Sequence, residues 1–219
     1  MKFIIPVTAV VAITLTLVGC AGEVQTESDE IKPANSITET SPTASPIPTP
    51  TRDPGPVKLT DTDASERFLN LVCPNNIAIA ELIASFDSGE SELFDGGDPD
   101  PTPVKVAAQK RVDLNRATIA LLDDEYFVWP VAVRDHIGHI RNSYMAELST
   151  LNAIANTATF RDAYYATWVE ATPEQAAAGQ EIRYQLGLDA NTTTSCDGYE
   201  TGVDDLTQEQ ASREAELGE

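Results

Sequence analysis

The sequence is short of basic residues. It has 14 lysines and arginines against 35 aspartates and glutamates, for a formal net charge of −21. A surface with this balance repels phosphate polymers, so nucleic acid and teichoic-acid-like polymers are poor candidate ligands. Cationic ligands and divalent metal ions remain electrostatically permitted. The default interpretation is simpler, because an acidic surface also keeps a protein in solution.

Catalytic signatures are also missing. The sequence contains no Gly-x-Ser-x-Gly, Ser-x-x-Lys or His-Glu-x-x-His motif, and no glycine-rich phosphate-binding loop. It has only two histidines and three cysteines. We therefore predict no catalytic residue and no cofactor, and we favour a non-enzymatic role.

The N-terminus has the pattern of a secretory signal. Lys2 gives a positive start, Phe3 to Val18 is apolar, and Leu17-Val18-Gly19-Cys20 closes the segment. The apolar run of about sixteen residues is shorter than a membrane-spanning helix needs, and Pro6 interrupts it. Its end resembles the lipobox of bacterial lipoproteins. The resemblance implies cleavage before Cys20, a diacylglyceryl group on its thiol, and anchoring at the extracytoplasmic face of the cell membrane.

The remaining cysteines follow from that assignment. If Cys20 carries the lipid, only Cys73 and Cys196 are left. An extracytoplasmic location permits disulfides, and two cysteines allow a single intramolecular pairing. We therefore expect a Cys73–Cys196 disulfide that closes the folded domain.

Composition divides the chain into four parts. Residues 1–19 form the predicted signal peptide. Residues 20–60 are rich in threonine, serine and proline and contain no aromatic residue, so they cannot bury a core and are predicted to form an extended stalk. We expect the folded domain at residues 61–196. Residues 197–219 are acidic with few apolar side chains, which predicts a mobile tail.

The domain is predicted to be all-α. Apolar residues recur at spacings of three, four and seven, and no segment shows the alternation of a strand. We predict an irregular bundle of four to five helices closed by the disulfide. Pro74 predicts a kink or two short helices meeting at Cys73–Asn76. An acidic, glycine-rich loop is expected from Asp87 to Asp100, with Thr102 capping the next helix.

Helix boundaries are also legible later in the chain. The apolar stripe of the helix that follows Trp129-Pro130 changes face after Ala155, which predicts a break at residues 156–159. Thr172-Pro173-Glu174-Gln175 is typical of a capping box at a helix start. Gly187 provides a left-handed stop after the same helix.

Further short motifs add a family resemblance. The lipobox and the stalk occur together with Leu71-Val72-Cys73-Pro74, and with the run from Ile182 to Leu188 before Cys196. This combination resembles uncharacterised lipoproteins of actinobacteria. The resemblance implies a surface-tethered helical domain and supplies no catalytic residues.

The two histidines are the main candidates for a metal site. His136 and His139 lie three residues apart in a strongly helical stretch, so they share one side, and Glu147 extends the same edge. Two imidazoles and a carboxylate are suitable ligands for zinc or copper. No further ligand is evident on another helix, however, and histidines at the edge of a bundle usually make local hydrogen bonds.

Two other groups of residues have competing interpretations. The six carboxylates between Asp87 and Asp100 do not match the spacing of an EF-hand, so we expect a solvated loop rather than a calcium site. The aromatic residues around Trp129 and Trp168 either line a small-molecule groove or belong to the core, and their helical spacing favours the core.

These observations predict a membrane-anchored extracytoplasmic lipoprotein that acts as a binding or interaction module at the cell envelope. Its partners would be the lipid bilayer, through lipidated Cys20, and an unidentified envelope protein or small ligand. No nucleic acid is expected. The alternative is a metal-dependent enzyme or metal carrier that uses His136, His139 and Glu147.

Overall fold

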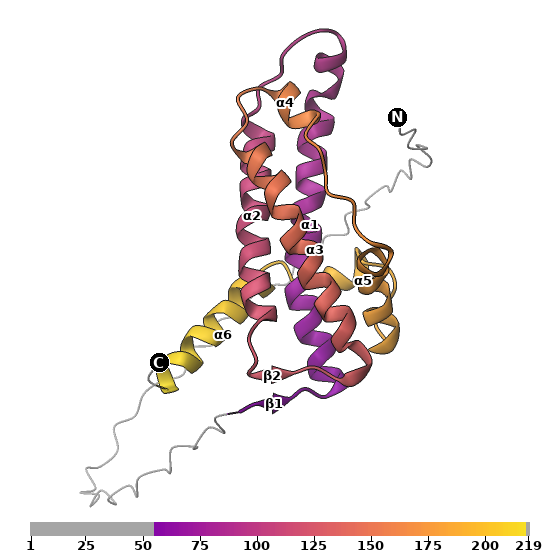
Figure 1. Ribbon diagram of the computed structural model, residues 1–219, viewed down its shortest axis with the longest axis vertical. Coiled ribbons are helices and arrows are strands. Elements are labelled where there is room, and N and C mark those ends of the chain that lie inside the picture. Colours follow the sequence, from indigo (N-terminus) through magenta and orange to yellow (C-terminus); the bar gives the residue numbers. More distant parts are fainter. Residues whose placement is uncertain (1–54, 218–219) are drawn as a thin grey trace, which may run out of the picture. The chain divides into compact units, whose positions relative to one another are not determined.

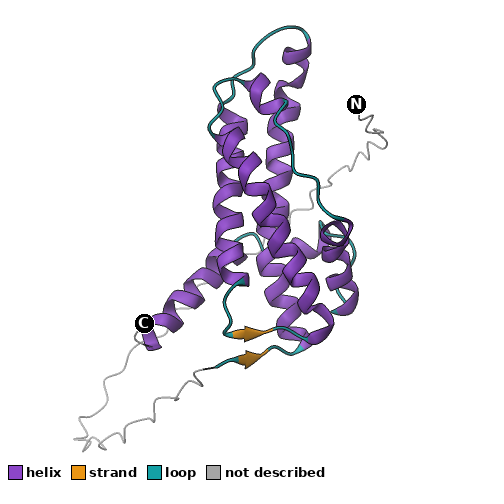
Figure 2. Cartoon of the chain, in the orientation of Figure 1, coloured by secondary structure: helices purple, strands orange, loops and turns teal. Residues whose placement is uncertain are grey.

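The computed structural model describes residues 55–217, and these fold almost entirely into helices (Figure 1). The elements are β1 (Val57–Lys58), α1 (Asp61–Phe94), α2 (Thr102–Leu122), β2 (Phe127–Val128), α3 (Val131–Ala155), α4 (Phe160–Tyr164), α5 (Pro173–Gln185), a 3₁₀ turn at Thr194–Cys196, and α6 (Gly202–Leu217). The prediction of an all-α bundle closed by a disulfide is confirmed (Figure 2). The predicted signal peptide, Cys20 and the stalk up to residue 54 lie outside the described residues.

The sequence predicted that the folded domain starts at residue 61, but the domain already includes β1 at residues 57–58. β1 pairs in parallel with β2, and the Val57 amide donates to the Tyr126 carbonyl at 2.7 Å. Thr60 then caps α1, because its hydroxyl accepts from the Asp63 amide at 3.2 Å and its own amide donates to the Asp63 carboxylate at 3.3 Å. The end of the predicted stalk therefore belongs to the domain.

α1 is longer and less interrupted than predicted. It passes through Pro74 as one helix, so the alternative of two short helices at this point is wrong. It also continues to Phe94, so the predicted loop at Asp87–Asp100 is helical over its first part. The Tyr164 hydroxyl of α4 donates to the Glu90 carboxylate, which holds this end of α1 against α4. Part of α1 is long and apolar enough to cross a membrane, but half of that stretch is buried in the bundle, as in a core helix.

The cap of α2 comes from Asp100 rather than from Thr102. The Asp100 carboxylate accepts hydrogen bonds from the Thr102 hydroxyl at 2.7 Å and from the Thr102 amide at 2.9 Å. These two bonds stabilise the ionised carboxylate and lower the pKa of Asp100. The acidic segment between α1 and α2 thus has a structural role at the start of a helix.

The boundaries predicted further along the chain are confirmed. α3 ends at Ala155, and Thr159 begins α4 by accepting from the Asp162 amide at 3.1 Å. Thr172 opens α5 with a capping box, since its hydroxyl accepts from the Gln175 amide and the Gln175 side chain accepts from the Thr172 amide. Helical period and local capping bonds both leave a pattern in the sequence, which is why these positions could be predicted.

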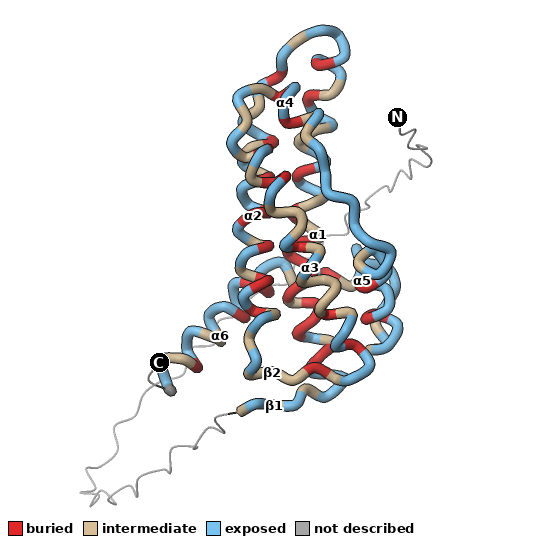
Figure 3. Tube along the Cα trace, viewed as in Figure 1, coloured by how far each residue is buried: buried red, intermediate tan, exposed pale blue. Residues whose placement is uncertain are grey.

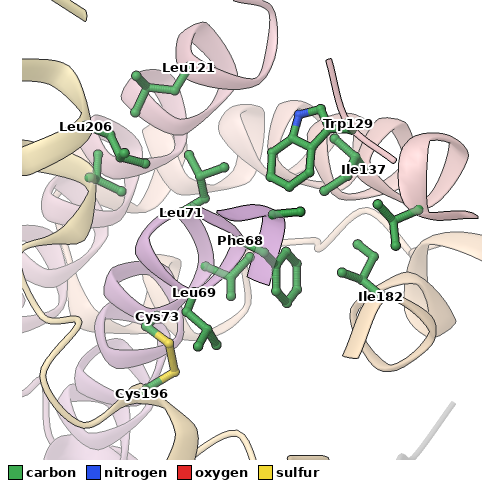
Figure 4. Close-up of a cluster of buried hydrophobic side chains, with 14 residues drawn as sticks. Phe68, Leu69, Leu71, Cys73, Leu121, Trp129, Ile137, Ile182, Cys196 and Leu206 are labelled. Atoms are coloured by element: carbon green, nitrogen blue, oxygen red, sulfur yellow. A yellow bond between two sulfur atoms is a disulfide. The ribbon is translucent and has the colours of Figure 1, made fainter. Parts of the chain in front are cut away.

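The core consists of two apolar clusters along the bundle, and buried positions recur down α1, α2 and α3 (Figure 3). The upper cluster, toward α4, contains Leu82, Val104, Val112, Leu151 and Phe160. The lower cluster, toward β1 and β2, contains Phe68, Leu71, Leu121, Trp129, Ile182 and Leu206 among others. In Figure 4, Phe68 lies toward Trp129 and Ile182, whereas Leu121 and Leu206 gather on the other side of α1.

The prediction of a mobile tail at residues 197–219 is wrong over most of its length. Residues 202–217 form α6, which packs on α1 and α2. Val203 and Leu206 join the lower cluster, and Arg213 is buried beside Tyr126 in an ion pair with Asp124 at 2.5 Å. Leu121 of α2 belongs to the same cluster as Val203 and Leu206 of α6.

Candidate functional site

A gap between α1 and α3 forms the most distinctive surface feature of the domain. α2 packs along both helices, whereas α1 and α3 have little direct backbone contact with each other. One face of α1 lines this gap over most of its length through Phe68, Val72, Asn76, Ile79, Ile83 and Phe86. Spacings of three and four residues place these six side chains on one side of the helix. The lower part of the gap is covered by α5, and Trp168 from the irregular segment 166–172 flanks the upper part.

The upper groove is a pocket of about 330 Å³ lined by Ile79, Leu82, Ile83, Phe86, Arg111, Glu147 and Trp168. Most of this lining is apolar, and two of its side chains are open to solvent. Trp168 is 40% exposed and Ile83 is 53% exposed. Exposed aromatic and aliphatic side chains beside a pocket are typical of binding surfaces.

A hydrogen-bonded ion pair contributes to the lining of the upper groove. The Arg111 guanidinium donates to Glu147 Oε2 through Nη2 at 2.6 Å and through Nε at 3.1 Å. Its third nitrogen donates to the Asn75 carbonyl of α1 at 2.6 Å, and the Asn115 amide also donates to Glu147 at 3.2 Å. These contacts join α1, α2 and α3, and they place a polar feature in an otherwise apolar groove.

The lower cavity has a volume of about 160 Å³ between α1, α3 and α5. It is lined by Phe68, Val72, Asn76, Ile140, Tyr144, Ala176, Gly179, Gln180, Arg183 and Thr192. Arg183 is 2% exposed. Its Nη1 atom donates to the Asp189 carbonyl at 2.9 Å and to the Ser195 hydroxyl at 2.6 Å. Its Nη2 atom is buried without a hydrogen-bond partner among the described residues.

A larger hollow of about 660 Å³ lies beside the disulfide. Its lining includes Asn76, Ile77, Ala80 and the residues from Thr192 to Thr194. The threonines are exposed, and the buried side-chain atoms that lack partners in residues 55–217 belong to residues outside this lining. We therefore do not choose this hollow as the candidate functional site.

The structure brings together only part of the predicted metal site. His136 and His139 are half-buried on α3, with their ring centroids 6.4 Å apart. Glu147 does not join them, because its carboxylate is paired with Arg111. Across residues 55–217, no group of three or more histidine, cysteine, aspartate or glutamate side chains is arranged to hold a metal ion.

The cysteine prediction is confirmed for the described residues. Cys73 of α1 and Cys196 of the 3₁₀ turn form a disulfide, with a Cα–Cα distance of 5.2 Å. The bond attaches the segment between α5 and α6 to the buried centre of α1. Cys20, the predicted lipidation site, lies outside the described residues.

The aromatic residues divide between the two roles that the sequence left open. Trp129 is buried in the lower cluster. Trp168 instead lines the upper groove and is partly exposed. Near it, the Tyr164 ring packs edge-on against Phe86 and Phe94 at centroid distances of 6.1 and 5.8 Å. The core interpretation holds for Trp129, and the groove interpretation fits the position of Trp168.

Sequence reasoning missed the two arginines that define the polar chemistry of these sites. Arg111 and Arg183 are both buried; Arg111 lies outside the short motifs, and the motif that contains Arg183, Ile182 to Leu188, gave no sign of a buried charge. The only available signal was their place within helical segments of otherwise apolar spacing. No family model, curated protein or solved structure matches this chain.

Proposed function

We propose that this chain is a membrane-anchored extracytoplasmic lipoprotein whose helical domain binds an envelope protein through the upper groove. The anchoring part rests on the lipobox-like sequence that ends at Cys20. The binding part rests on one observation: an apolar pocket of about 330 Å³ with exposed Trp168 and Ile83 at its surface. Isolated exposed apolar residues are ordinary, but a gathered set beside a pocket favours an interaction site.

The size of the apolar surface favours a protein partner over a small ligand. Phe94 and Tyr165 are both more than half exposed, and both pack against Tyr164, which in turn contacts Phe86 in the groove. The groove thus continues into an exposed aromatic surface at the α4 end of the bundle. Protein interfaces are enriched in aromatic residues of this kind, with a few of them supplying most of the binding energy.

The charges around this surface indicate which partner it suits. Asp87, Glu92, Asp95 and Asp98 are exposed at the same end of α1 and on the segment that follows it. Carboxylates in this position repel anionic lipid headgroups, so insertion of the aromatic surface into the membrane is disfavoured. They favour an apolar protein segment flanked by basic residues, because complementary charge increases the association rate.

Site-specific photo-crosslinking in intact envelopes tests this proposal. We would replace Ile83 with p-benzoylphenylalanine, which places the reactive group in the groove. The matched control carries the same residue at Val106, which is similarly exposed but lies on α2 outside the groove. The proposal predicts a discrete protein adduct from position 83 that is absent from position 106 and is lost with Trp168→Ala. Equal adducts from both positions, or none from position 83, would contradict it.

The metal-dependent alternative has less support. It required Glu147 beside His136 and His139, and the Glu147 carboxylate is held by Arg111 at 2.6 Å. A metal ion would have to compete with that ion pair for the carboxylate, or use the two histidines with ligands from elsewhere. Elemental analysis of the purified chain provides the direct test.

A further inference from the structure

Arg183 differs from the other buried arginines of residues 55–217 because it forms no ion pair there. Within this part of the chain, four arginines are buried, and three of them form ion pairs: Arg67 with Glu209, Arg111 with Glu147, and Arg213 with Asp124. Arg183 is the most deeply buried of the four, and its hydrogen bonds within the described residues go only to a backbone carbonyl and a hydroxyl. A buried charge without a counter-ion is energetically costly.

The neighbouring carboxylate does not supply that counter-ion. Asp189 presents its backbone carbonyl to Arg183, while its side-chain carboxylate accepts from the Asn191 amide at 2.8 Å. Desolvation lowers the pKa of Arg183, and the charge of Asp189 only partly opposes this effect. The Nη2 donor of the guanidinium therefore has no hydrogen-bond partner among the described residues. Arg183 is also one of the residues that line the lower cavity.

Other donors line the same cavity. Tyr144 is one of the lining residues, and burial raises the pKa of its hydroxyl. Gln180, Asn76 and Thr192 also line the cavity, although the Gln180 amide donates to the Ala190 carbonyl at 3.3 Å and the Asn76 amide donates to the Cys196 sulfur at 3.9 Å. Phe68, Val72 and Ile140 contribute an apolar wall. A ligand that fits this lining has an anionic acceptor group at one end and an apolar body at the other.

Gly179 contributes no side chain to the lining of the lower cavity on the α5 side. It lies in the interior of α5, where glycine is less favourable than alanine for helix stability. Its backbone does not require glycine, and a Cβ atom there would meet only Ile140 Cδ1 at an ordinary distance of 3.9 Å. An alanine at this position would therefore add its Cβ atom to the lining of the lower cavity without a clash.

We infer that the lower cavity binds the carboxylate of a small organic acid, with Arg183 as its charge partner. A volume of about 160 Å³ corresponds to about five water molecules, so the ligand is a short monocarboxylate and not a polymer. The inference concerns a different cavity from the upper groove and is independent of a protein partner there.

Calorimetric titration of the chain from residue 21 onward tests the inference. The probes are acetate, butanoate and hexanoate, each compared with the primary amide of the same length. The expected result is saturable binding of butanoate in the millimolar range or tighter, and at least tenfold weaker binding of butanamide. Absence of saturable binding for all three acids would overturn the inference, as would equal affinities for acid and amide.

Two variants separate binding from folding. Arg183→Met should abolish the preference for the acid over the amide. Because this change also removes the bonds to Asp189 and Ser195, it could unfold the chain, and Gly179→Ala serves as the second variant. Gly179→Ala should raise the melting temperature through better helix propensity, yet weaken butanoate binding at least tenfold by filling the cavity. Unchanged butanoate affinity in a folded Gly179→Ala variant would contradict the assignment.

Discussion

Gly202 at the start of α6 lies directly on the backbone of Asn70 in α1. A Cβ atom on Gly202 would fall 2.5 Å from both the Cα atom and the carbonyl oxygen of Asn70. Asn70 is the residue whose carbonyl loses its usual helical donor because Pro74, four positions on, has no amide hydrogen. The two helices therefore cross where α1 carries a proline and α6 begins with a glycine.

This close approach predicts that Gly202→Ala destabilises the domain. The clash is with backbone atoms, which cannot move aside as a flexible side chain would, so we expect a loss of about 1–3 kcal/mol in the free energy of unfolding. Gly138→Ala in α3 is the matched control, since a Cβ there meets nothing within 4 Å. It should leave stability unchanged or raise it by up to about 1 kcal/mol. Denaturant titration measures both, and equal stabilities for the two variants would contradict the docking of α6.

The same region shows why the sequence predicted α6 as a mobile tail. Its contribution to the apolar core comes from Val203 and Leu206, too few residues to establish a helical period. The rest of its attachment comes from polar groups, namely the ion pairs of Arg213 with Asp124 and of Glu209 with Arg67. Such long-range partners do not show as a pattern in the chain.

The predicted features that proved correct depend on local chemistry. The capping box at Thr172 and the break before Phe160 follow from neighbouring side chains and helical period. The disulfide followed from having only two cysteines to pair. In contrast, the environments of Arg111 and Arg183 depend on which helices meet around them, and helix propensity carries no information about that. The sequence therefore predicted the bundle but not its two polar sites.

The disulfide is expected to contribute a few kcal/mol to stability. Cys73 and Cys196 are separated by 123 positions. Closing a loop of this size lowers the entropy of the unfolded chain, which raises its free energy by about 3–5 kcal/mol in simple models. Reduction of the chain from residue 21 onward should therefore lower its melting temperature by roughly ten degrees or more. The double variant Cys73→Ala plus Cys196→Ala should match the reduced protein. Two titratable thiols in the native, unreduced chain would show that the bond is absent.

Stability should fall at high pH because of Tyr164. Its hydrogen bond to Glu90 raises the pKa of the phenol from 10.0 to about 12. The folded state therefore retains this proton more tightly than the unfolded state. The stabilisation of the folded state that results from this pKa difference is complete below pH 10. It is lost as the pH rises toward about 12. Tyr164→Phe should flatten this part of the pH profile of the denaturation midpoint, whereas Tyr184→Phe, on an exposed part of α5, should not. Identical profiles for both variants would contradict the role of the Glu90 contact.

The histidine pair provides the test between a binding module and a metal protein. His136→Ala plus His139→Ala should alter the free energy of unfolding by only about 0.5 kcal/mol per site, as expected for half-buried edge positions. EDTA should leave the melting curve unchanged, because a structural metal ion would otherwise contribute strongly to stability. Elemental analysis after refolding with zinc or copper completes the test. Stoichiometric metal that disappears in the double variant would support the metal alternative.

The most direct test of a lipid-anchored envelope module is metabolic labelling with a palmitate analogue in intact cells. The wild-type chain should incorporate the label and sediment with the membrane fraction, because diacylglycerol on the Cys20 thiol, with a further acyl chain, anchors a protein stably without a membrane-spanning helix. Cys20→Ser removes the acceptor thiol, so the variant should lose the label and retain its uncleaved N-terminal segment. Cys73→Ala plus Cys196→Ala should keep the label, as the matched control. Equal labelling of the wild type and Cys20→Ser would contradict the lipoprotein assignment.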